Sequence, residues 1–66
     1  MKELPSEYEI LLLAYGVEPP DVLDFRVLWA DDYGLCVEWW AEGRRHEAKL
    51  ARLEDGLKIL WHWSGN

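Results

Sequence analysis

The sequence predicts an α+β domain in which one N-terminal helix packs on one face of a four-stranded antiparallel meander sheet. Three observations support this fold class. An apolar block ends at a glycine near residue 16, the hydrophobic period changes to two at about residue 22, and two Gly-containing hairpin turns follow. With 66 residues the chain has room for a single domain, 1–66, with a small core.

The helix is expected at about residues 6–15. Ser6 and Glu9 have the spacing of a capping box, and Gly16 is a typical C-terminal stop. Its apolar residues, 10–14, are consecutive and wrap around more than one side. Either a thick core surrounds the helix, or another molecule covers its back. Pro19 and Pro20 then predict an extended connector.

Alternation predicts the first two strands. In the first, Leu23, Phe25, Val27 and Trp29 share one face, and residues 35–42 alternate in the same way after a turn at residues 31–34. The pairs Glu42-Gly43 and Asp55-Gly56 predict hairpin turns that frame a third strand, 44–54, and a fourth, 57–63.

The third segment has an alternative, because residues 47–54 are rich in helix formers. We favour a strand since two-residue turns give consistent registers on both sides. These registers set Ala48 opposite Val37 and Trp63, and Leu50 opposite Leu35 and Trp61. The face under the helix would then hold the core, which consists of Phe25, Val27, Trp29, Val37, Trp39, Ala48, Leu50, Ile59, Trp61 and Trp63.

On the opposite face, the same registers place Trp40 between Arg26 and Arg45, where guanidinium groups can lie against the indole. This packing is one interpretation of Trp40. The other is an interface anchor, because Trp and Arg are enriched at binding hot spots and because apolar neighbours share that face, namely Leu28, Ala51 and Leu60.

The residue types of catalytic and metal sites are scarce. The registers place His46 inward but His62 and Cys36 outward, so no three metal ligands converge. Residues 31–34 lack the spaced carboxylates of a calcium loop, and there is no phosphate-binding glycine loop and no nucleophile set. We therefore expect no enzyme activity, no cofactor and no metal.

Cysteine and hydropathy bear on location. Cys36 is the only cysteine, so no intrachain disulfide is expected, and the longest apolar run, 10–15, is too short for a secretory signal or a membrane span. These features favour the cytoplasm.

The net charge of −6 arises entirely before residue 34. Residues 1–33 carry two basic and eight acidic side chains, whereas residues 34–66 carry five of each. Direct nucleic-acid binding is disfavoured, because it needs a basic footprint. The acidic half is either an ordinary solvated surface or a set of phosphate mimics for a basic protein. The acidic residues are Glu3, Glu7, Glu9, Glu18, Asp21, Asp24, Asp31 and Asp32. The candidate partner-binding residues are Glu7, Glu18, Asp21, Asp24, Asp31, Asp32 and Trp40.

In size, acidity, lack of cysteine pairs and lack of a catalytic motif, the chain resembles the small phage-encoded anti-CRISPR proteins. The resemblance covers the general character of the whole chain and assigns no residue a role. It implies a stoichiometric inhibitor of a nucleic-acid-binding, CRISPR-type complex. The alternatives are a small structural or assembly protein that self-associates, for example as a homodimer through the helix or the Trp40 face, and an antitoxin-like regulatory partner.

Overall fold

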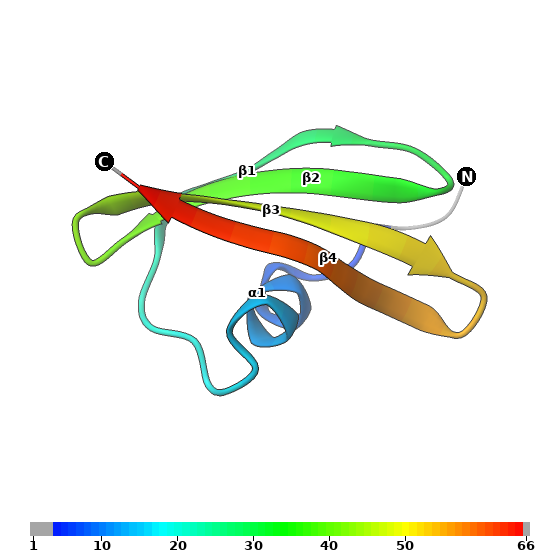
Figure 1. Ribbon diagram of the computed structural model, residues 1–66, viewed down its shortest axis with the longest axis horizontal. Coiled ribbons are helices and arrows are strands. Elements are labelled where there is room, and N and C mark those ends of the chain that lie inside the picture. Colours follow the sequence, from blue (N-terminus) through cyan, green and yellow to red (C-terminus); the bar gives the residue numbers. More distant parts are fainter. Residues whose placement is uncertain (1–3, 66) are drawn as a thin grey trace.

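A computed structural model describes residues 4–65 and contains one helix on a four-stranded antiparallel sheet (Figure 1). The helix is α1 (Glu7–Tyr15), and the strands lie in the order β1 (Leu23–Ala30), β2 (Gly34–Ala41), β3 (Arg44–Leu53) and β4 (Gly56–Gly65). The predicted α+β class is confirmed. The third segment is a strand, so the helical alternative for residues 47–54 is wrong.

Both ends of α1 form as their sequence signals predict. The Ser6 hydroxyl accepts a hydrogen bond from the Glu9 amide at 3.1 Å, which satisfies one of the free N–H groups of the first turn. At the other end, Gly16 adopts a left-handed conformation with φ 75°, and its amide donates to the Leu12 carbonyl at 2.8 Å.

The first hairpin turn depends on Asp31 and Gly34. The Asp31 carboxylate accepts hydrogen bonds from the Tyr33 and Gly34 amides, at 2.8 and 2.9 Å. Gly34 then lies so close to β3 that a Cβ atom there would be 2.7 Å from the Leu50 carbonyl oxygen. Only glycine fits at the start of β2.

The predicted pairing of β2 with β3 is confirmed, with Val37 opposite Ala48 and Leu35 opposite Leu50. The predicted pairing of β3 with β4 is wrong. Ala48 lies opposite His62, and Leu50 lies opposite Ile59. The turn uses residues 54 and 55 instead of 55 and 56, and Leu60 is an extra residue in β4 at the register shift, which is a β-bulge.

The bulges decide which tryptophans are buried. Beyond Leu60, Trp61 and Trp63 turn away from the helix and are 42% and 51% exposed, while His62 turns inward. β1 has two comparable irregularities. One of them sets Trp29 opposite Cys36 on the side away from the helix, 44% exposed. Trp29, Trp61 and Trp63 are therefore not core residues, and His62 does not point outward.

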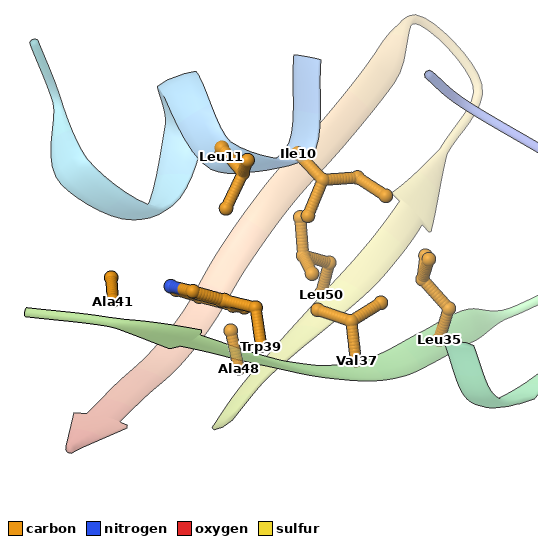
Figure 2. Packing of buried hydrophobic residues seen from close by; sticks show 8 residues of the cluster. All are labelled: Ile10, Leu11, Leu35, Val37, Trp39, Ala41, Ala48 and Leu50. Carbon is orange, nitrogen blue, oxygen red and sulfur yellow. The ribbon is translucent and has the colours of Figure 1, made fainter. Parts of the chain in front are cut away.

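The core lies between α1 and the middle strands. Figure 2 shows Leu11 of the helix above Trp39 and Ile10 above Leu50 and Val37, and the remaining sheet residues of the cluster are Leu35, Ala41 and Ala48. Phe25 stacks on Trp39 with ring centroids 6.3 Å apart. Val27 faces the same side but stays partly exposed, because α1 packs toward β4 and away from β1.

Candidate functional site

We call the sheet face under α1 the inner face and the opposite one the outer face. No described helix or strand packs on the outer face (Figure 1). Cross-strand pairing arranges its side chains in three rows that reach from β1 to β4, and in a shorter row of Gly34, Ala51 and Lys58 at one end of the sheet. From β1 to β4, the rows are Trp29, Cys36, Lys49 and Trp61; then Arg26, Glu38, Glu47 and Trp63; then Leu23, Trp40, Arg45 and Gly65.

The centre of the outer face is an ion-pair network around Glu38. This carboxylate is only 5% exposed, although no helix covers it. It accepts hydrogen bonds from Arg26 and, at 2.7 and 3.0 Å, from two nitrogens of Arg45. Arg45 also donates to Glu47 at 2.8 Å. The hydrogen bond from Arg45 is the main reason that the pKa of Glu38 lies below its usual value. The network holds the central charges in fixed, paired positions.

Indole rings lie beside Arg45 of this network and beside the neighbouring Lys49. The Arg45 guanidinium lies 5.8 Å from the centre of the Trp63 ring, and the Lys49 ammonium lies 5.6 Å from that of Trp29. Trp40 lies opposite Arg45, as predicted, but its β1 neighbour is Leu23, because Arg26 lies opposite Glu38. The predicted placement of Trp40 between two arginines is wrong on the β1 side, where the bulge shifts the register.

Cys36 lies in the same face but is poorly suited to nucleophilic chemistry. The thiol is buried, and its Sγ donates to a Glu47 oxygen at 3.7 Å. Burial, together with the negative charge of Glu47, raises the pKa of the Cys36 thiol. A reactive cysteine needs the opposite environment, one that stabilises the thiolate.

Most of the acidic candidates belong to α1 and its connector, which lie on one side of the sheet (Figure 1). Asp24 lies at the start of β1, at a hollow that Arg26 and Trp40 also line. Glu7, Glu18, Asp21 and Asp24 are all exposed. The Tyr8 hydroxyl donates to Glu18 at 2.7 Å, which ties the connector back to the first turn of the helix. Between residues 4 and 24 the sequence contains no lysine or arginine. We call the acidic residues of this stretch the acidic side: Glu7, Glu9, Glu18, Asp21 and Asp24.

Asp31 and Asp32 do not lie with the acidic side. They follow the other end of β1, roughly 20 Å along the strand from Asp24. Asp31 also has a structural role in the turn, since its carboxylate holds two backbone amides. The predicted set of carboxylates is thus divided between two places, and Glu3 lies outside the described residues.

Two histidines meet under the helix, which the sequence did not suggest because the bulge at Leu60 was not foreseen. His62 Nδ1 lies 3.2 Å from the Ala14 carbonyl, and His62 Nε2 lies 2.9 Å from His46 Nδ1. Because a carbonyl only accepts, the contact with Ala14 places a hydrogen on Nδ1 of His62. Burial lowers the pKa of His46. Through these contacts the pair attaches the last turn of α1 to the sheet.

Within residues 4–65, no group of three or more His, Cys, Asp or Glu side chains is arranged to hold a metal ion. No helix in that part of the chain is long and apolar enough to cross a membrane. No protein family, curated protein or solved structure matches the chain. The function therefore has to be argued from the outer face and the acidic side themselves.

Proposed function

We propose that this chain is a non-catalytic binding protein whose acidic side attaches to the basic surface of a nucleic-acid-binding protein. One observation carries the proposal. The helix, the connector and the first residues of β1 expose five carboxylates without an intervening lysine or arginine. Of the cationic side chains of the neighbouring sheet, Arg26 and Arg45 are engaged by Glu38 and Glu47 on the other face. Arg52 lines a hollow together with Glu9 near the start of the helix and offsets part of the negative charge there. The other carboxylates of the acidic side keep most of their field.

Such a surface attracts the proteins that normally bind phosphates. A basic channel of low dielectric constant concentrates negative charge, and the resulting steering raises the association rate strongly at low salt. Carboxylates on a folded scaffold can occupy these channels in place of DNA. The same charges oppose direct contact of this chain with DNA or RNA.

The general resemblance to anti-CRISPR proteins supports a narrower proposal, in which the partner is a CRISPR-type complex and the chain is its stoichiometric inhibitor. Binding in the DNA channel would block the target without any covalent step. This proposal implies action in the cytoplasm of the cell that holds the complex.

The proposal is tested with the purified chain, an assembled RNA-guided DNA-binding complex and, as a second probe, an unrelated basic DNA-binding protein. Surface plasmon resonance at low and raised salt gives the association rate, and a labelled target duplex reports competition. We expect the chain to displace the duplex, and the association rate to fall steeply as salt increases.

Matched charge reversals then locate the contact. Changing Glu18, Asp21 and Asp24 together to lysine should slow association roughly tenfold or more, with little change in the thermal melt. The control changes Glu42, Glu54 and Asp55 to lysine, which alters the net charge equally but at the second and third hairpin turns. If both variants bind as the unchanged chain does, or if the chain never displaces the duplex from either probe, the proposal is wrong.

A further inference from the structure

The outer face places most of the tryptophans of a 66-residue chain outside its core. Trp39 is completely buried, whereas Trp29, Trp61 and Trp63 are more than two fifths exposed and Trp40 is only partly buried. We propose that a second copy of this chain covers the outer face, so that two four-stranded sheets pack face to face with a helix on each outside. This proposal is independent of the partner proposed above.

The edges of the sheet are poor sites for adding another strand. β1 is interrupted by two register irregularities and β4 by the bulge at Leu60. Bulges of this kind twist an edge away from the straight ladder that an added strand requires, and natural sheets use them to prevent edge pairing. A second molecule would therefore bind on the outer face of the sheet and not along its edges.

Charge does not oppose a second copy at this face. The central rows hold Arg26, Arg45 and Lys49 against Glu38 and Glu47, and the exposed Lys58 lies opposite Ala51 at the end of the sheet. The two carboxylates already have arginine partners, and Lys49 lies over an indole ring. A second copy can therefore cover the central rows without burying an unpaired carboxylate, which would carry a large penalty. The acidic sides, which would repel each other, stay on the outside of such a dimer.

The order of residues in the rows is self-complementary. A two-fold axis that runs along the strands, between β2 and β3, lays β1 of one copy over β4 of the other without moving any row. Trp29 then meets Trp61 of the second copy, and Arg26 meets Trp63. In the third row Trp40 meets Arg45. Each of these three contacts occurs twice and joins an aromatic ring to another ring or to a cation. The same axis sets Cys36 over Lys49 and Glu38 over Glu47 of the second copy, and both of these carboxylates keep the Arg45 of their own copy as a partner.

The size of the face fits a stable dimer. Strands of 8 to 10 residues in a four-stranded sheet span roughly 30 Å by 19 Å, or about 570 Å² in projection. Protruding side chains increase the accessible area above this projection. Stable interfaces bury about 800 Å² per partner, out of a total surface of 4628 Å² for this chain. An open hollow beside Trp61 and Trp63, lined also by Glu47 and His62, can receive a protruding side chain of the second copy.

The test is the mass of the full chain in solution. Sedimentation equilibrium between micromolar and several hundred micromolar should give a particle of twice the 7.8 kDa chain mass at the upper end. Trp29→Lys and Trp61→Glu should each weaken self-association roughly tenfold or more, because tryptophan is among the residue types that dominate interface energies and each change also places a charge in the contact. Mixing these two variants should restore a dimer, because the lysine then faces the glutamate across the proposed axis.

Val17→Glu is the control, since Val17 is exposed on the connector and the change adds the same charge there as Trp61→Glu adds on the outer face. It should dimerise as the unchanged chain does, and circular dichroism should show all variants folded. A chain that sediments as a monomer throughout the range overturns the proposal. So does a dimer that survives both tryptophan variants, or a mixture of these two variants that stays dissociated.

Discussion

The two faces of this sheet use tryptophan in opposite ways. On the inner face, Trp39 is completely buried, and its Nε1 donates to the Tyr15 hydroxyl at 3.0 Å. On the outer face, Trp29 and Trp63 are about half exposed and lie beside the cations of Lys49 and Arg45. The difference shows that hydrophobic content alone does not define the core. A nine-residue helix covers the inner face, whereas indole rings of the outer face lie against charged side chains.

The largest expected difference in stability is between a variant that lacks the inner Trp39 ring and a variant that lacks the outer Trp40 ring. Trp39→Ala should lower the free energy of unfolding by roughly 3–5 kcal/mol, because it leaves a large cavity under α1. Trp40→Ala should cost only about 1 kcal/mol, since that ring is partly exposed. Urea melts at low protein concentration measure both. Equal losses would contradict the assignment of the two faces.

The hydrogen bond between Tyr15 and Trp39 gives a smaller effect that is specific to the inner face. Tyr15→Phe keeps the ring but leaves the indole Nε1 of Trp39 without its acceptor, which should cost about 1–3 kcal/mol. Tyr33→Phe removes a hydroxyl from the most exposed tyrosine and should leave the melt unchanged. A Tyr15→Phe variant as stable as the unchanged chain would mean that this bond contributes no net stability.

The histidine pair should make stability depend weakly on pH. Burial lowers the pKa of His46 in the folded chain, with His62 and Arg44 acting in the same direction and a hydrogen bond to the Ala41 backbone and the charge of Glu42 opposing them. The unfolded chain therefore takes up a proton near the ordinary pKa of 6.5 while the folded chain does not. Stability should be complete above that pH and decrease as the pH falls below it.

Thermal melts between pH 7.5 and 5.5 check this dependence. The Tm should decrease toward pH 5.5 in the unchanged chain and less so in His46→Phe. Glu38 does not interfere, because its lowered pKa keeps it ionised, and its contribution present, above its ordinary value of 4.5. Identical slopes for the two proteins would show that His46 keeps an ordinary pKa when folded.

The sequence alone predicted the structure correctly where the signals were local. Ser6 and Gly16 bounded the helix, and the paired strands β2 and β3 had only one register that kept Val37 and Leu35 on the same side as Ala48 and Leu50. Elsewhere the alternation of apolar and polar residues did not show which face each residue occupies, because apolar residues lie on both faces. In β4, Leu60 and Trp61 are adjacent, so alternation gives no preference for either face, and one extra residue reverses the outcome.

The candidate surfaces were also predicted only in part from the sequence. The excess of carboxylates in residues 1–33 was visible in the sequence, but its division between the acidic side and the first hairpin turn required the fold. The network around Glu38 was not predicted, because nothing in a β2 segment of alternating residues marks one glutamate as buried between two arginines. Nor does the sequence show that Trp61 and Trp63 join Trp29 on one face.

The bulge at Leu60 also affects how this chain can change in evolution. Single substitutions in β4 alter one contact each, whereas deletion of this one codon would exchange the environments of every residue after it. Trp61 and Trp63 would point at the helix, and His62 would enter the outer face, away from the Ala14 carbonyl. We therefore expect related sequences to vary in the residue at position 60 but to keep the number of residues between the last hairpin turn and Trp63.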